Sequence, residues 1–163
     1  MSGARTYIAV CGPDPAPDEV AAQCESVGRA IAEAGAVLVC GGLGGAMEAA
    51  SRGAATVGGT VLGILPGGDR AAANQFVGVA VPTGMGEMRN ALIVRAADAV
   101  IAVGGEFGTL SEIAFALKAG TPVVGIGTWE LARANARSAD PIVRVETADE
   151  AVATALRLAR AAG

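Results

Sequence analysis

The chain has 163 residues, enough for one domain with a sizeable core, and its 52% hydrophobic and 17% charged composition excludes intrinsic disorder. A net charge of −4 with scattered cations argues against nucleic-acid binding, which needs a clustered basic face. No apolar run reaches the roughly 18 residues that span a bilayer, so we expect no membrane association.

Short apolar segments alternate with helical ones along the whole chain. The predicted strands are 7–11, 36–40, 60–64, 75–81, 99–103, 122–126 and 142–145. Most are continuous runs of Val, Ile, Leu and Ala, which is typical of strands covered on both faces of a parallel sheet. The predicted helices are 18–34, 45–57, 86–97, 109–119 and 147–161. This order predicts a single α/β domain over residues 1–163, a doubly wound Rossmann-like fold with a mostly parallel sheet of about six or seven strands flanked by helices.

The ends of these helices carry recognisable signals. Asp18 follows Pro15 and Pro17 and is predicted to cap the first helix. Gly35 and Gly120 stand where the first and fourth helices end, at positions that favour a left-handed residue. The residues before the first strand show no secretory cleavage pattern, which leads us to expect a cytoplasmic location.

Glycines gather in two turns, 41–45 and 104–109, each joining an apolar strand directly to a helix. The first reads Val39-Cys-Gly-Gly-Leu-Gly-Gly-Ala-Met-Glu and the second Val103-Gly-Gly-Glu-Phe-Gly-Thr-Leu-Ser-Glu. Such turns let backbone N–H groups approach an anion, and the helix N-terminus adds favourable partial charge. Because both follow strand ends, at the edge where open α/β sheets bind ligands, they predict a small phosphorylated ligand.

Several other chemistries are excluded. The first turn, Cys11-Gly-Pro-Asp-Pro, lacks the glycine fingerprint of dinucleotide dehydrogenases, and no Gly-Lys-Ser/Thr follows either glycine turn. The chain has no histidine, which removes the Ser-His-Asp triad and most catalytic zinc sites. The three cysteines, Cys11, Cys24 and Cys40, are expected to be buried free thiols, and no metal site is expected.

Arg89 and Glu112 each have a structural and a functional interpretation. Thr109-Leu-Ser-Glu112 fits a capping box, in which Glu112 returns to the backbone of Thr109, yet this also places its carboxylate beside the ligand. Arg89 lies in the first turn of its helix, where the helix dipole disfavours a cation, which favours contact with an anionic ligand or a carboxylate. Arg95 is expected in an ion pair, and Trp129 in core packing rather than stacking on a base.

The sequence resembles a known family over roughly residues 5–128. The two most specific blocks are Gly41-Gly-Leu-Gly-Gly-Ala-Met-Glu-Ala-Ala-Ser-Arg-Gly-Ala and the segment from Arg89-Asn-Ala-Leu-Ile-Val-Arg to Gly104-Gly-Glu-Phe-Gly-Thr-Leu-Ser-Glu112. They are similar to the Rossmann-fold family labelled "possible lysine decarboxylase". That family includes the Lonely Guy-type phosphoribohydrolases and the molybdenum cofactor carrier proteins.

In the phosphoribohydrolases the second block reads R-K…PGGxGTxxE, and Arg89 and Glu112 match its arginine and glutamate. The resemblance then implies hydrolysis of a purine or cytokinin nucleoside 5′-monophosphate to free base and ribose 5-phosphate. Glu112 would stabilise the oxocarbenium-like sugar or orient water, and Arg89 would help to hold the ligand.

Departures from this pattern point to the cofactor-carrier branch, whose members bind molybdopterin or have no assigned function. Met88 and Asn90 replace the glutamate and lysine that flank the arginine, and Gly104 replaces the proline. Glu106 replaces a glycine, which places a negative charge where phosphate is expected and would strain a backbone of positive φ. The lone lysine, Lys118, ends a helix away from the ligand edge, so we expect no pyridoxal-dependent decarboxylase.

We therefore expect a protein that binds a nucleotide monophosphate or a molybdopterin-type ligand, with no cofactor required. The alternatives are a phosphoribohydrolase with Arg89 and Glu112 as catalytic residues, and a non-catalytic dimeric scaffold. The resemblance also suggests a homodimer. The residues expected to bind the ligand or its phosphate are Gly12, Gly41, Gly42, Gly44, Gly45, Met47, Gly105, Gly108 and Thr109.

Overall fold

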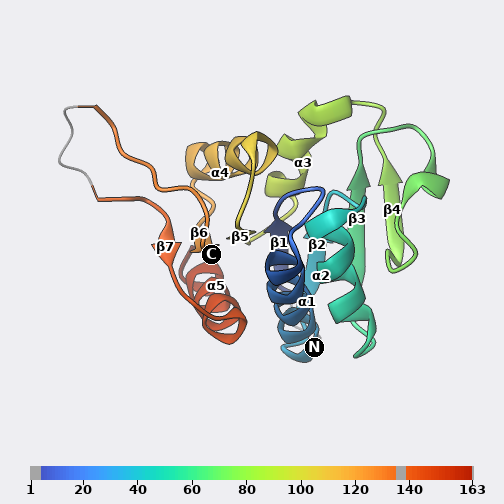
Figure 1. Cartoon of the computed structure of the whole chain (residues 1–163), viewed down its shortest axis with the longest axis horizontal. Helices are drawn as coiled ribbons and strands as arrows, with labels where there is room; N and C mark the ends of the chain where they lie inside the picture. The colour runs from blue at the N-terminus through green and yellow to red at the C-terminus, as the bar shows by residue number, and fades with distance from the viewer. Residues whose placement is uncertain (1–4, 135–138, 163) are drawn as a thin grey trace.

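The computed structural model, which describes residues 5–134 and 139–162, contains a seven-stranded sheet whose neighbouring strands are all parallel (Figure 1). The strands are β1 (Tyr7–Cys11), β2 (Val37–Cys40), β3 (Val61–Leu65), β4 (Val79–Pro82), β5 (Ala99–Val103), β6 (Val123–Ile126) and β7 (Val143–Arg144). The helices are α1 (Asp18–Glu33), α2 (Gly45–Ala55), α3 (Asn90–Arg95), α4 (Phe107–Ala119) and α5 (Ala148–Ala162), with short 3₁₀ turns η1 (Arg70–Ala72) and η2 (Gly86–Arg89).

The strand order, β4-β3-β2-β1-β5-β6-β7, is that of a doubly wound sheet. The chain starts in the middle at β1, winds outward to β4 and returns to pair β5 with the other side of β1, where Ile8 lies opposite Ala99. The carboxyl ends of β1 and β5 therefore flank the point at which the winding direction changes. Open α/β sheets bind their ligands at such points.

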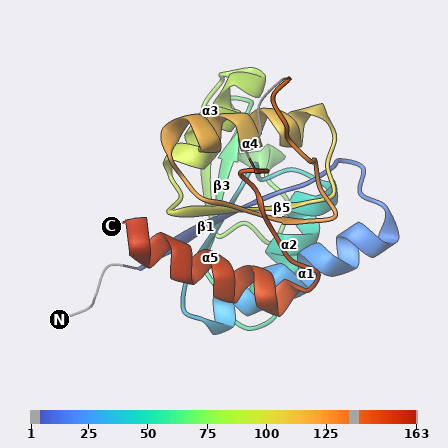
Figure 2. The ribbon, with the colours of Figure 1, turned by 90° about the vertical axis from the view of Figure 1, so that its left-hand side faces the viewer.

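Helices cover both faces of the sheet, as the perpendicular view in Figure 2 shows. Helices α1, α2 and α5 lie on one face and α3 and α4 on the other. Alternate residues of β1 feed the two cores: Ile8 and Val10 pack towards the first layer, Ala9 and Cys11 towards the second. The predicted fold class is thus confirmed, including strands buried on both faces.

Helices α1 and α2 approach each other through glycine. A Cβ atom added at Gly28 would lie 1.9 Å from the carbonyl oxygen of Ala50, and one added at Gly53 would lie 1.9 Å from that of Glu25. The two backbones are therefore in direct contact. The salt bridge from Arg52 to Glu25 at 3.0 Å closes the same interface.

Most predicted elements are confirmed, and the differences have local causes. The strand expected over 75–81 is limited to Val79–Pro82, because the Asn74 side chain accepts from the N–H of Phe76 and holds the preceding residues in a turn. The helix expected over 86–97 begins as the 3₁₀ turn η2. Asp18 does not cap α1: Pro17 takes that position, and Asp18 is the first helical residue.

The structure also bears on the predicted helix ends, the cysteines and the membrane-spanning segments. Gly35 and Gly120 have φ of +74° and +78° at the ends of α1 and α4, as predicted. The three cysteines are buried and free. In the described part of the chain, every helix falls short of the length or hydrophobicity required to cross a membrane.

Candidate functional site

The carboxyl ends of the central strands border a cavity of about 390 Å³. This volume is within the range of small-molecule binding sites. Its walls come from the loops after β1, β2, β3 and β5 together with η2 and the N-terminal part of α4. The lining residues are Gly12, Pro13, Asp14, Leu43, Met47, Pro66, Glu87, Arg89, Asn90, Glu106, Gly108, Thr109 and Glu112.

The first glycine turn is covered by the loop that follows β1. The N–H of Ala46 at the start of α2 donates to the Pro13 carbonyl oxygen at 3.0 Å. A Cβ added at Gly44 would lie 3.3 Å from both carboxylate oxygens of Asp14. The α2 N-terminus therefore already has a carbonyl and a carboxylate of this chain above it, which leaves less room there for a phosphate than the sequence suggested.

The second glycine turn is the more open of the two. Gly104 and Gly105 take positive φ values of +57° and +125°, whereas Glu106 has φ −105°, so the glutamate introduces no backbone strain. A Cβ added at Gly108 would meet nothing within 4 Å. Thr109 is 2% exposed, and its Oγ1 has no hydrogen-bond partner among the residues described. A buried hydroxyl without a partner at a cavity wall is a group that a ligand can satisfy.

The buried side chain of Arg89 connects the carboxyl ends of β2 and β3 through hydrogen bonds. Its Nε donates to the carbonyl oxygen of Ile64 at 2.8 Å, and its Nη2 lies 3.4 Å from that of Gly41. Arg89 is 7% exposed, and burial lowers the pKa of its guanidinium. A Cβ at Gly41 would lie 2.6 Å from Nη2, so this glycine is required for the close approach of Arg89.

Asn90 connects Arg89 to α4 through hydrogen bonds. Its Oδ1 accepts a hydrogen bond from Nη1 of Arg89, and its Nδ2 donates to Oγ of Ser111 at 3.0 Å. Ser111 in turn donates to the carbonyl oxygen of Gly108 at 2.7 Å. Asn90, where the family pattern has lysine, thus connects Arg89 to the first turn of α4.

Glu112 lies deep in the cavity and does not form the predicted capping box. Helix α4 starts at Phe107, with Glu106 before it, so Thr109 is already inside the helix and its N–H is not the one a capping glutamate reaches. Burial raises the pKa of Glu112 to about 7, although the Cys11 thiol and the Arg89 guanidinium both act to lower it. Burial and the neighbouring Glu112 raise the pKa of Cys11. Near neutral pH the Glu112 carboxyl group can therefore donate or accept a proton.

The charges on the cavity wall are unequal. Four carboxyl groups, those of Asp14, Glu87, Glu106 and Glu112, line the cavity together with one guanidinium, that of Arg89. Within residues 5–134 and 139–162, however, no three His, Cys, Asp or Glu side chains gather closely enough to hold a metal ion. The acidic side chains are thus distributed around the cavity rather than concentrated at one point.

The predicted site residues fall into two groups. Those that line the cavity are Gly12, Met47, Arg89, Gly108, Thr109 and Glu112. Those that shape the turns behind it are Gly41, Gly42, Gly44, Gly45 and Gly105. Sequence reasoning did not select Asp14 and Glu87, although the position of Asp14 in the turn after β1, at the same sheet edge, was a usable signal.

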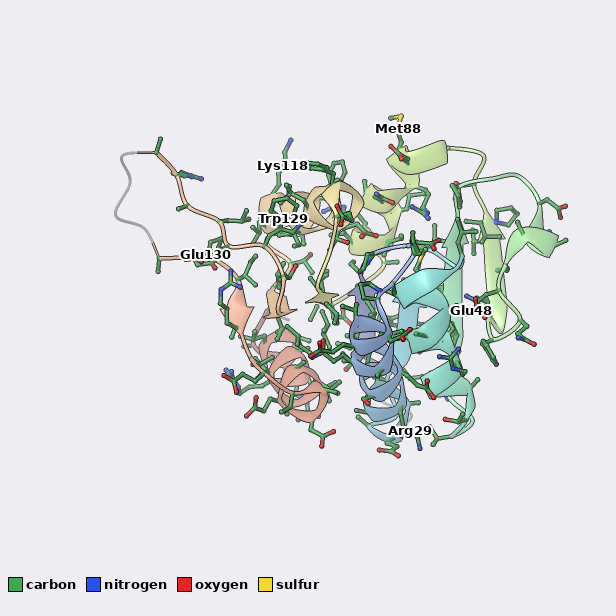
Figure 3. All side chains as sticks on the ribbon, viewed as in Figure 1. Arg29, Glu48, Met88, Lys118, Trp129 and Glu130 are labelled. Atoms are coloured by element: carbon green, nitrogen blue, oxygen red, sulfur yellow. The ribbon has the colours of Figure 1, made fainter. Side chains whose placement is uncertain are left out.

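Two further expectations concern residues near the cavity. Trp129 packs against the α3–α4 side of the core, as predicted, and its indole N–H donates to the carbonyl oxygen of Glu106 at 3.3 Å (Figure 3). Its ring lies 5.6 Å from that of Phe107. The ion pair expected for Arg95 is wrong for the described residues, where the salt bridges are those of Arg52 and Arg144.

Comparison with known proteins gives one family match and several similar structures. Residues 5–153 match the SLOG cluster4 family. An uncharacterized protein of Archaeoglobus fulgidus is 45% identical over 119 residues, covering 73% of this chain and 78% of its own length. The structure of the molybdenum cofactor binding protein from Rippkaea orientalis is 38% identical, with a TM-score of 0.75 over 79% of this chain and 80% of that one. The Moco carrier protein from Chlamydomonas reinhardtii is 30% identical, with a TM-score of 0.84 over 97% of this chain and 99% of that one.

Proposed function

The chain belongs to the SLOG cluster4 family, and from this premise we propose that it binds a phosphorylated cofactor or nucleotide at the carboxyl edge of its sheet. Two similar structures are those of molybdenum cofactor binding and carrier proteins, which supports a cofactor-binding role. The cavity at the switch point is large enough for a small ligand of this kind.

The observation that carries the proposal is the unpartnered hydroxyl of Thr109 at the open N-terminus of α4. The first N–H groups of a helix have no partner inside the helix, and the helix dipole favours an anion there. Gly108 in the first turn has no side chain, and a Cβ there would meet nothing within 4 Å, so the helix start is open at this residue. Glu106 precedes this helix, and its exposed carboxylate must stay turned to solvent when a phosphate binds. We therefore assign the phosphate to α4 rather than to α2, whose N-terminus donates to Pro13 and lies beside Asp14.

Isothermal titration with GMP, AMP, ribose 5-phosphate and released molybdenum cofactor tests this assignment. Removing one hydrogen bond to a phosphate should weaken binding about tenfold in Thr109→Val. Thr128→Val is the matched control, because the Thr128 hydroxyl is also buried and unpartnered in the described residues but does not line the cavity. Equal losses of affinity in both variants would contradict the assignment of the phosphate to α4. If no probe binds, the scaffold alternative is favoured.

Hydrolysis of a nucleoside 5′-monophosphate is the second candidate. The observation in its favour is Glu112, a buried cavity carboxyl group with a pKa of about 7, which suits general acid–base chemistry. Against it, the hydrogen bonds of Arg89 to Ile64, Gly41 and Asn90 occupy much of the guanidinium. We expect no release of adenine from AMP by chromatography. If the wild type releases adenine and Glu112→Gln does not, the protein is a hydrolase rather than a binding protein.

A further inference from the structure

The cavity lining offers a ligand two kinds of group. The N-terminus of α4 supplies the hydroxyl of Thr109 and helix N-terminal N–H groups, which suit an anion. Carboxylates line the same cavity, among them those of Asp14 in the loop after β1, Glu87 on η2 and Glu106 before α4. A ligand that fits both kinds of group presents its phosphate to α4 and hydrogen-bond donors to a carboxylate.

The backbone at Asp14 is held against the first glycine turn. Its predecessor Pro13 is buried and accepts the N–H of Ala46. A Cβ added at Gly45, where φ is +57°, would lie 2.6 Å from the Pro13 carbonyl oxygen and 2.7 Å from Cα of Asp14. The loop after β1 and the first glycine turn are thus fitted to each other. Gly44 and Gly45 make room for an aspartate of this chain.

The Asp14 carboxylate also has free acceptor capacity. No hydrogen bond to its oxygens occurs within the described residues, although they lie above the start of α2. Asp14, Glu87 and Glu106 are all exposed. What distinguishes Asp14 is the close fit of its backbone against Gly45, which fixes the point at which its side chain leaves the loop. Asp14 is therefore the cavity carboxylate whose position is best defined.

A carboxylate selects for two N–H donors that lie side by side. Paired charge-assisted hydrogen bonds add both energy and geometric specificity. Guanine and pterin rings carry a ring N–H next to an exocyclic amino group, whereas adenine carries an amino group next to an acceptor nitrogen, which repels a carboxylate. Building on the proposed cofactor-binding function, we propose that Asp14 accepts the paired N–H groups of a 2-amino-4-oxo ring, and so selects guanine-like or pterin-like ligands over adenine-like ones.

Titration with GMP, IMP, AMP and ribose 5-phosphate, all in the presence of EDTA, tests the selection. GMP should bind at least about tenfold more tightly than AMP, since a bidentate pair discriminates between bases by roughly that factor or more. IMP keeps the ring N–H but lacks the amino group, and its affinity should fall between the two. Ribose 5-phosphate reports the phosphate contact alone.

Asp14→Asn should change the affinities for AMP and GMP in opposite directions rather than weaken both. An amide offers one acceptor and one donor, which matches the edge of adenine and not that of guanine. The variant should therefore bind AMP more tightly and GMP less tightly than the wild type. Glu87→Gln is the matched control: removing this charge should change GMP and AMP affinity alike and leave their ratio unchanged.

The outcomes separate this inference from the proposed function. Equal binding of GMP and AMP, with Thr109→Val weakening both, overturns the role of Asp14 and leaves phosphate binding intact. No binding of these four compounds or of released molybdenum cofactor overturns the proposed function itself. A preference for GMP that appears only when Mg²⁺ replaces EDTA indicates a cation bridge and also overturns the direct contact. The wild-type series decides the question even if Asp14→Asn fails to fold.

Discussion

At the scale of single residues, Glu112 makes stability depend on pH. Its pKa is raised from 4.5 to about 7, so between these values the folded state binds more protons than the unfolded state. The free energy of unfolding should therefore fall as pH rises from about 4.5 to 7 and level off above, by an amount on the order of 3 kcal/mol. Urea unfolding at pH 5, 6, 7 and 8 measures this slope.

Glu112→Gln removes the titration while keeping the shape of the side chain. We expect the variant to lose this part of the slope and to be more stable than the wild type at pH 8. Glu106→Gln changes an exposed carboxyl group of the same cavity and should keep the wild-type profile. A Glu112→Gln protein that is less stable than the wild type at pH 8 would show that Arg89 outweighs the cost of burial.

Gly41 makes a second prediction at this scale. A Cβ there would lie 2.6 Å from both Nη2 of Arg89 and Sδ of Met47, so Gly41→Ala must displace the guanidinium of Arg89. We expect a loss of about 1–3 kcal/mol in unfolding free energy. Gly108→Ala is the control, because its Cβ meets nothing within 4 Å inside α4, and it should stabilise the ligand-free protein by up to about 1 kcal/mol.

The residues of the candidate site were only partly predictable from the sequence. The turns and strand ends identify the edge, and Thr109 and Glu112, both selected for their place at this edge, line the cavity there. What the pattern does not contain is the path of the loop after β1, which places Asp14 over the first turn. Nor does it reveal that carbonyl oxygens of other strands would bind the guanidinium of Arg89. Both depend on tertiary contacts between distant segments.

At the scale of elements, the contact between α1 and α2 is the most sensitive to volume. Gly28→Ala and Gly53→Ala each place a methyl group 1.9 Å from a backbone carbonyl oxygen, which only a shift of a whole helix can relieve. A backbone atom cannot move aside as a side chain can. Each substitution should therefore lower the free energy of unfolding by about 3 kcal/mol or more, which calorimetry measures. Gly67→Ala, which meets nothing within 4 Å, should leave the unfolding temperature nearly unchanged.

The boundaries of elements were less predictable than their order. Apolar runs locate the central strands within one residue, because burial on both faces imposes a continuous hydrophobic sequence. Strand β4 is at the sheet edge and half exposed, so its pattern is weaker, and the turn made by Asn74 delays its start. The 3₁₀ turn η2 was likewise indistinguishable from the first turn of a helix.

At the scale of the whole molecule, the outer face of α3 and α4 is the surface at which we expect a second copy to pack. A groove there is lined by Ala91, Val94 and Arg95 of α3 and by Phe115, Lys118 and Ala119 of α4. These positions recur at helical spacing on the two helices, and Phe115 is 42% exposed. Lys118 points outward from the same layer (Figure 3).

Phe115→Glu tests this surface. If two copies pack through the groove, the buried charge should convert a dimer to a monomer in light scattering coupled to size exclusion, with the fold unchanged by circular dichroism. Val57→Glu is the control, because Val57 has a similar exposure of 41% but lies after α2, on the other side of the sheet. If one chain forms the whole site, the monomeric variant should still bind GMP, and a loss of binding would show that the partner copy completes the site.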